Sequence, residues 1–321
     1  MAGVLRIDDS IHLIDLDFQG VPGVIGAYLI DGGDEKALVE IGPTSTLDSL
    51  LTGLTEAGTA PEEIGKILVT HIHLDHAGGA GTFIRRFPQA RLYVHEVGAS
   101  HMVDPLKLWH SASRIYGDMM EPLWGSIEPI PADKIVSMGD NVSIQVGRLA
   151  LTAVYTPGHA SHHVAYHDAD RDVVLTGDVA AVRLQGVGYV RPPTPPPDID
   201  LEAWDRSLDR LRDLRPRRLL LTHFGPFDDV AHHLDAAQQR LHAWADVVRR
   251  AEESGQGRPE IVDNLMLHGN RELMAVTTRA DALQAYELAT PYGMTVDGYL
   301  RYFRKAAAAS EGAKTASKSQ S

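Results

Sequence analysis

Four side chains that can bind a metal ion lie close together in the motif HIHLDH at residues 71–76. The motif directly follows an apolar run that is typical of a buried strand. Alternate residues of an extended segment point the same way, so His71 and His73 can hold one ion together. After the chain turns, Asp75 and His76 can bind a neighbouring ion. The spacing therefore predicts metal-dependent chemistry rather than a group of solvated histidines.

Three later segments place further candidate ligands at the ends of predicted strands. They are TPGH at 156–159, TGD at 176–178 and LTH at 221–223. Strand ends that converge on one edge of a sheet can bring residues roughly 150 positions apart into one site. The chain has no cysteine, which excludes disulfides, thiolate nucleophiles and thiolate ligands. Any bound metal must therefore be held by nitrogen and oxygen.

In this order, the segments THIHLDHAGG, TPGHASHH, TGD and THFGP resemble the metallo-β-lactamase superfamily over about residues 10–250. The resemblance implies an α+β fold, a four-layer αββα sandwich of two similar halves with a metal site along one edge. The sequence is similar to the dinuclear glyoxalase II-like and lactonase-like branches of the superfamily. It is unlike the bacterial β-lactamases that use a cysteine ligand. The implied ligands are His71, His73 and His159 for the first ion, Asp75, His76 and His223 for the second, and Asp178 as a bridge between them.

Some features depart from the family or lie outside its motifs. Glu40-Ile41-Gly42 stands where many members have Asp-Thr-Gly, which leaves the supporting role of that turn open. The C-terminal region shows no convincing glutathione-binding set, which argues against a glyoxalase II substrate. A proline-rich loop at 183–198 follows the bridging aspartate and is stiffened by its prolines. The candidate substrate contacts are Arg183, Tyr189 and Arg191 in this loop and His162 beside a ligand. The alternative for the three loop residues is that they face solvent, and the alternative for His162 is a supporting or packing role.

The ligand set predicts a metal-dependent hydrolase. Two divalent ions activate a hydroxide that attacks an ester, thioester, lactone or phosphoester, and they polarise the attacked oxygen. Asp75 is the expected catalytic residue, because it can orient the hydroxide and carry its proton as well as bind metal. Nitrogen and oxygen ligands suit zinc best, with manganese or iron as alternatives. Positive charge at the centre favours a small anionic or carbonyl-bearing substrate.

Other functions remain open. A single iron held by Asp178 with His71 and His73 or His159 would support a sulfur (persulfide) dioxygenase. A nucleic-acid phosphodiesterase is disfavoured by a net charge of −13, because nucleic-acid surfaces normally require an excess of basic residues. A metal-binding scaffold without activity is disfavoured by the complete ligand set.

The remaining sequence supplies the elements that position these residues. The resemblance implies a metallo-β-lactamase-like domain at 1–254. Strand and helix patterns and composition add a helical insertion at about 100–125, a helical subdomain at 255–305 and a loose tail at 306–321. His232 and His233 lie on a predicted helix and are expected to face solvent. No apolar run reaches the roughly 18 residues of a membrane span, so we expect no membrane partner and a cytoplasmic location. A homodimer through the apolar appendages is left open.

Overall fold

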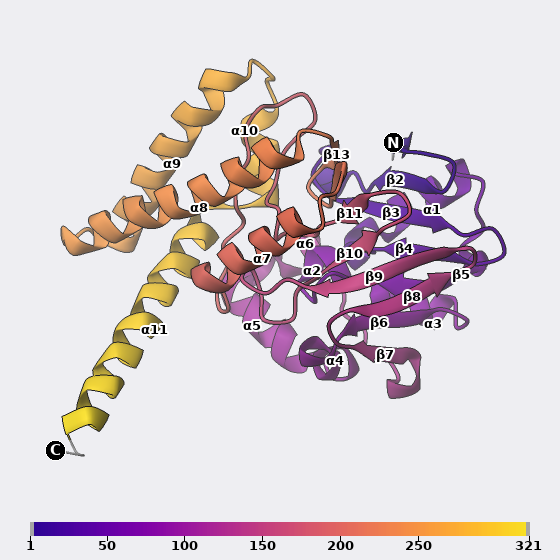
Figure 1. Cartoon of the computed structure of the whole chain (residues 1–321), viewed down its shortest axis with the longest axis horizontal. Helices are drawn as coiled ribbons and strands as arrows, with labels where there is room; N and C mark the ends of the chain where they lie inside the picture. Colours follow the sequence, from indigo (N-terminus) through magenta and orange to yellow (C-terminus); the bar gives the residue numbers. More distant parts are fainter. Residues whose placement is uncertain (1–2, 319–321) are drawn as a thin grey trace.

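Two β-sheets stacked face to face form the centre of the molecule (Figure 1). The computed structural model describes residues 3–318, with side chains described through residue 308. The first sheet has the order β1-β2-β3-β4-β5-β6-β7, with bounds Val4–Arg6, Ile11–Asp15, Gly26–Asp31, Lys36–Val39, Ile64–Leu68, Arg91–His95 and Ile135–Met138. The second has the order β13-β12-β11-β10-β9-β8, and β8 to β13 span Val142–Val146, Leu149–Tyr155, Val164–Asp168, Val173–Leu175, Arg218–Leu221 and Gly225–Phe227.

Alternation along the strands divides the apolar side chains between two cores. In β2, Leu13 belongs to the core between the sheets, whereas Ile14 belongs to the core beneath the outer helices. Tyr28 of the first sheet and Tyr166 of the second lie in the same inter-sheet core. Successive side chains of a strand point to opposite faces, so each sheet buries one face against the other sheet and one against helices. The predicted α+β sandwich is confirmed.

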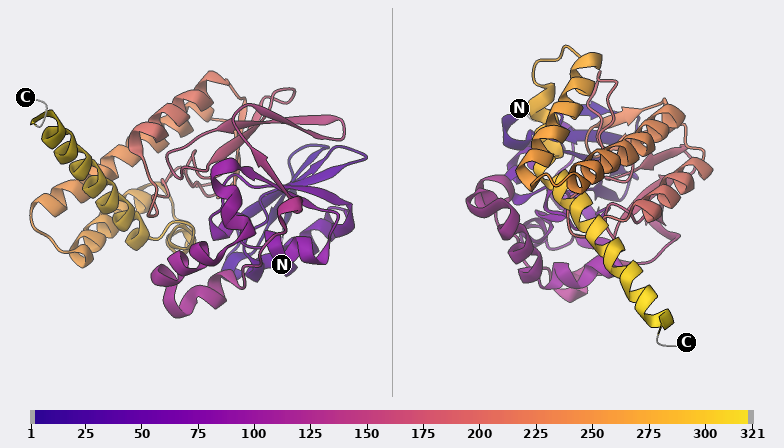
Figure 2. Two further views of the ribbon diagram at one scale, coloured as in Figure 1. Left: turned by 90° about the horizontal axis from the view of Figure 1, so that it is seen from below. Right: turned by 90° about the vertical axis from the view of Figure 1, so that its left-hand side faces the viewer.

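Helices cover the outer faces of the sandwich (Figure 2). They are α1 (Leu47–Glu56), α2 (Leu74–Ala77), α3 (Ala80–Arg86), α4 (Glu96–Val103), α7 (Leu201–Asp213) and α8 (Val230–Glu253), with short 3-10 turns at Phe18–Gly20, Thr44–Thr46, Pro61–Glu63, Gly117–Met119 and Ala132–Lys134. The insertion forms α5 (Leu106–Tyr116) and α6 (Met120–Trp124). The last helices are α9 (Arg258–Val276), α10 (Ala282–Ala289) and α11 (Tyr292–Lys318).

The chain's C-terminal end differs from the loose tail that its composition predicts. Helix α11 continues to Lys318 and projects away from the sandwich (Figure 2). Alanine has the highest helix propensity, and residues 306–309 are all alanine, which favours continuation of the helix. Residues 319–321 of the expected tail lie outside the described residues. Within residues 3–318, no helix combines the length and apolar character needed to cross a membrane.

His233 is buried, which corrects the expectation that it faces solvent. Its Nε2 donates a hydrogen bond of 2.6 Å to the carbonyl oxygen of Ala180, and its ring stacks on Phe227. The face of α8 that carries His233 packs over the segment following β11, whereas His232 remains exposed. Burial lowers the pKa of His233 to about 4, so the imidazole is neutral in the folded protein at pH 7.

Acid is therefore expected to destabilise the protein through His233. The unfolded chain protonates this residue near its ordinary pKa of about 6.5, whereas the folded chain does so only near 4. The free energy of unfolding should fall by up to about 3 kcal/mol from this residue as the pH drops through that window. Denaturant unfolding of wild type and His233→Gln at pH 7, 5.5 and 4 measures the difference. If the two proteins differed in free energy of unfolding by the same amount at all three pH values, His233 would not be a source of the acid sensitivity.

Candidate metal centre

All the predicted ligands converge at one edge of the sandwich, where strands from both sheets end. His71 follows β5, Asp178 follows β11 and His223 follows β12. Strands β4 and β5 run parallel in one sheet, as do β11 and β12 in the other, so their carboxyl ends meet at the same edge. The ligand atoms form three groups whose members lie within 4.8 Å of one another: His71, His73 and His159; His71, His76 and Asp178; Asp75, His76 and His223.

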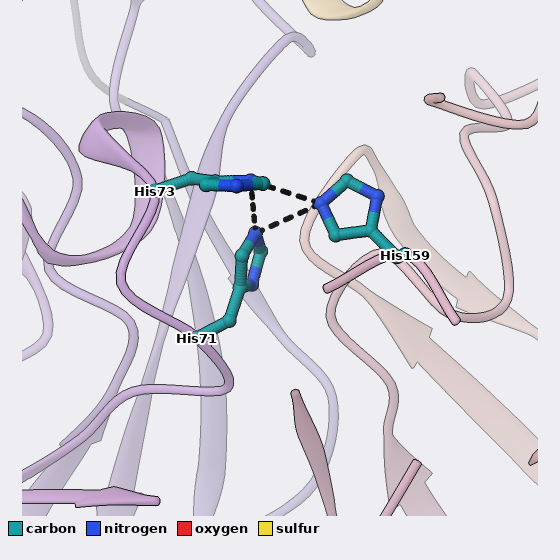
Figure 3. A group of neighbouring side chains, drawn as sticks. All are labelled: His71, His73 and His159. Carbon is teal, nitrogen blue, oxygen red and sulfur yellow. Dashed lines mark hydrogen bonds between the residues drawn. The ribbon is translucent and has the colours of Figure 1, made fainter. Parts of the chain in front are cut away.

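The first group is a triangle of imidazole nitrogens (Figure 3). Nε2 of His71 lies 2.9 Å from Nδ1 of His73, and Nε2 of His159 lies 3.1 Å and 2.9 Å from these two atoms. Burial lowers the pKa of all three residues, that of His73 to about 3, so the rings are neutral and their nitrogens can act as ligands. Convergent lone pairs repel one another unless a cation lies among them. The triangle therefore fits a metal ion.

The second group contains Asp75, His76 and His223. Oδ2 of Asp75 lies 3.5 Å from Nε2 of His76 and 3.5 Å from Nε2 of His223. The two imidazole nitrogens are 3.4 Å apart. Burial lowers the pKa of His76, but the carboxylates of Asp75, Asp178 and Glu40 outweigh it and raise that pKa well above its ordinary value. A positive charge is thus favoured here, either as a proton or as a bound cation.

Asp178 lies between the two groups. Its Oδ2 is 3.3 Å from Nε2 of His159, and its Oδ1 is 3.3 Å from Nε2 of His76 and 3.4 Å from Nε2 of His223. Oδ1 is buried and has no hydrogen-bond partner among the described residues. Buried carboxylate oxygens are normally paired or bound to metal. One carboxylate thus offers an oxygen to each group, as a bridging ligand would.

Hydrogen bonds on the outer side of the rings fix which nitrogen faces the centre. Nδ1 of His159 lies 2.8 Å from the carbonyl oxygen of Pro193, and Nδ1 of His223 lies 2.6 Å from that of Val24. A carbonyl oxygen only accepts, so both Nδ1 atoms must carry the proton. Their Nε2 lone pairs then point into the centre, which is the tautomer that metal ligation requires.

Glu40 fills the supporting role that the sequence left open. Its side chain is fully buried, and Oε1 accepts hydrogen bonds from Thr70 Oγ1 at 2.6 Å, Thr222 Oγ1 at 3.3 Å and His76 Nδ1 at 3.0 Å. Thr70 Oγ1 donates to Glu40, so it can accept from Nδ1 of His71, 3.0 Å away. Glu40 therefore orients a ligand of each group, His71 through Thr70 and His76 directly.

His163 also supports the centre, through hydrogen bonds on both of its ring nitrogens. Its Nε2 accepts a hydrogen bond of 3.1 Å from the backbone N–H of Asp178, and its Nδ1 donates to Thr156 Oγ1 at 2.9 Å. Gly177 makes this approach possible: its φ is +53°, and a Cβ there would lie 2.4 Å from Thr70 Oγ1. The TPGHASHH motif was the only sequence signal for His163.

A cavity of about 340 Å³ opens over the metal centre. His73, Asp75, His159 and Asp178 lie at its floor, and His162 also lines it. Its walls come from α4 to α6, from α10 and α11, and from the proline-rich segment Pro193–Pro197.

The other candidate substrate contacts lie outside this lining, which corrects their expected role. Arg183 pairs with Asp229 at 2.8 Å. Tyr189 is buried and bonds Glu272 at 3.0 Å, and Arg191 is buried with its guanidinium 3.7 Å from the Tyr292 ring centre. A planar guanidinium pairs with carboxylates and stacks on aromatic rings, so Arg183 fastens the loop beside the start of α8 and Arg191 fastens it to α11. Tyr189 fastens the loop to α9.

Comparisons with known proteins agree with this geometry. The profile of the metallo-beta-lactamase superfamily matches residues 20–223. The metallo-beta-lactamase fold-containing protein ST1585 of Sulfurisphaera tokodaii is 30% identical over 219 residues, 67% of this chain and 78% of that protein. The crystal structure of metallo-beta-lactamase family protein TTHA1429 from Thermus thermophilus superposes with a TM-score of 0.64 at 24% identity, covering 88% of this chain and 89% of that one.

Two further relatives have named activities. An atrochrysone carboxyl ACP thioesterase of Aspergillus fumigatus is 26% identical over 58% of this chain and 46% of its own length. An acyl-coenzyme A thioesterase of Homo sapiens is 24% identical over 54% of this chain and 64% of its own length. The matches thus span less than two thirds of either thioesterase. From the matched profile, the relatives and the fold, the chain belongs to the metallo-beta-lactamase superfamily.

Proposed function

We propose that the protein is a hydrolase of acyl thioesters that uses two divalent metal ions. The observation that carries the proposal is the pair of ligand groups joined by Asp178 at the floor of one cavity. The thioesterase activity named for two relatives supports a thioester over the other bonds that this kind of centre can cleave. Fold alone does not determine the substrate, so the bond must be tested directly.

In this mechanism, His71, His73 and His159 hold the first ion, and Asp75, His76 and His223 hold the second. When bound, the two ions supply a hydroxide nucleophile at neutral pH and polarise the carbonyl under attack. Burial raises the pKa of Asp75, but His76 and His223 outweigh it and hold that pKa well below its ordinary value. Asp75 is thus a carboxylate at neutral pH.

Asp75 is well placed for a second role in the reaction. Its side chain retains one-fifth of its exposure and lines the cavity, whereas Asp178 is almost fully buried. A carboxylate that faces the substrate can orient the attacking group and carry its proton toward the leaving sulfur. Glu40 and His163 act as positioning residues, because they hold the ligands rather than touch the substrate.

Removing the metal tests this proposal. Protein purified without added metal is expected to contain about two ions per chain by elemental analysis. Treatment with a chelator followed by desalting should abolish hydrolysis of an acyl thioester, and zinc, manganese or iron should restore it. A matched oxygen ester, a lactone and a phosphodiester serve as comparison substrates. The result that would contradict the proposal is one iron per chain, oxygen uptake with a persulfide and no hydrolysis. That result would favour the persulfide dioxygenase instead.

A further inference from the structure

We infer that the cavity over the metal centre binds the apolar acyl group of the substrate; this inference rests on the proposed thioesterase function. The ligands His73, Asp75, His159 and Asp178 line the same space as the apolar walls, so the two are continuous. A thioester whose carbonyl lies at the ligands would extend its acyl chain along these walls.

The walls are formed by apolar side chains from segments far apart in the sequence. Leu108 and Ile115 come from α5, Ala289 from the end of α10 and Met294 from α11. The Oη of Tyr116 lies 3.0 Å from Sδ of Met294, so the insertion and the C-terminal helices meet beside the cavity. This contact engages the phenol hydroxyl of Tyr116 with the Met294 thioether at the cavity wall.

Charged groups of the lining outside the metal centre are few, and two of them are already engaged. Oδ1 of Asp198 lies 3.9 Å from Nζ of Lys305, and Oε2 of Glu287 lies 3.4 Å from Nη2 of Arg191. Lys107 is exposed on α5. Most of the remaining lining residues are apolar, so an apolar chain would gain free energy by leaving water for this space.

Binding of straight-chain carboxylates tests the inference apart from catalysis. Acids of about four to twelve carbons are titrated by calorimetry into the protein as purified and after chelator treatment. Affinity should rise about fourfold for each added methylene group until the cavity is filled, and then level off. In parallel, kcat/KM for the matching thioesters should follow the same dependence on chain length.

Two variants and a control locate the effect. Ala289→Trp adds a large side chain to the wall and should shorten the chain length at which affinity levels off. Leu108→Ala removes wall atoms contributed by α5 and should weaken octanoate binding about fivefold or more. Leu267→Ala changes an exposed apolar residue on α9, outside the lining, and should match the wild type.

The outcomes separate the two proposals. Thioester hydrolysis with affinities that do not depend on chain length would overturn the acyl cavity and leave the hydrolase in place. Chain-length-dependent binding that Ala289→Trp shortens, with no hydrolysis of any thioester, would support the cavity and reject the proposed activity. Chain-length dependence that neither wall variant alters would place the acyl chain elsewhere and overturn the inference.

Discussion

Asp178→Asn is expected to lower kcat/KM for thioester hydrolysis by about 10³-fold or more, with the fold retained. The carboxylate offers one oxygen to each ligand group, and both oxygens lie within 3.4 Å of imidazole nitrogens. An amide of the same size removes one oxygen and the negative charge that two divalent ions require. The backbone N–H of Asp178, which bonds His163, is unaffected by the change.

Elemental analysis and steady-state kinetics of the purified variant measure the effect, and its circular dichroism spectrum checks the fold. Asp213→Asn removes an exposed carboxylate from α7 and is the matched control, with wild-type metal content and rate. Wild-type turnover and full metal content in Asp178→Asn would show that Asp178 is not a metal ligand. Loss of turnover with both ions still bound would make Asp178 important for the reaction without making it a required ligand.

Glu40→Ala is expected to lower both metal affinity and stability, although Glu40 is not itself a proposed ligand. Its removal leaves the N–H of His76 and the hydroxyls of Thr70 and Thr222 without their buried acceptor. Losing such an outer partner typically weakens metal binding about 10- to 100-fold. Unpaired buried donors cost about 1–3 kcal/mol each before the site relaxes, so we expect a loss of about 3 kcal/mol in the free energy of unfolding.

Two measurements separate these effects. Competition with a chromogenic chelator gives the metal affinity, and denaturant unfolding of the metal-free protein gives the stability alone. Glu40→Gln keeps the volume and one acceptor oxygen, so both losses should be smaller than in Glu40→Ala. Glu62→Ala, at an exposed position, is the control for removing a carboxylate. Unchanged chelator competition in Glu40→Ala would show that Glu40 does not orient the ligands.

Local spacing was enough to predict the metal-binding character of the motif at 71–76, whereas the full ligand set and the sandwich fold followed from the family resemblance. HIHLDH follows a buried strand, and the strand-loop geometry that places His71 and His73 side by side is encoded within a few residues. The strand and helix patterns likewise predicted sheet strands and covering helices. The absence of cysteine by itself restricted the candidate ligands to nitrogen and oxygen.

The supporting contacts and the substrate cavity were decided only by tertiary structure. Glu40 bonds Thr222, which lies 182 positions away, and Arg191 packs on Tyr292 of α11 rather than facing the substrate. His233 is buried because α8 packs over Ala180, a contact that the helical pattern of α8 does not specify. Such contacts depend on how separately folded elements pack together. Sequence spacing determines the geometry within an element, whereas the free energy of burial and pairing determines which distant elements meet.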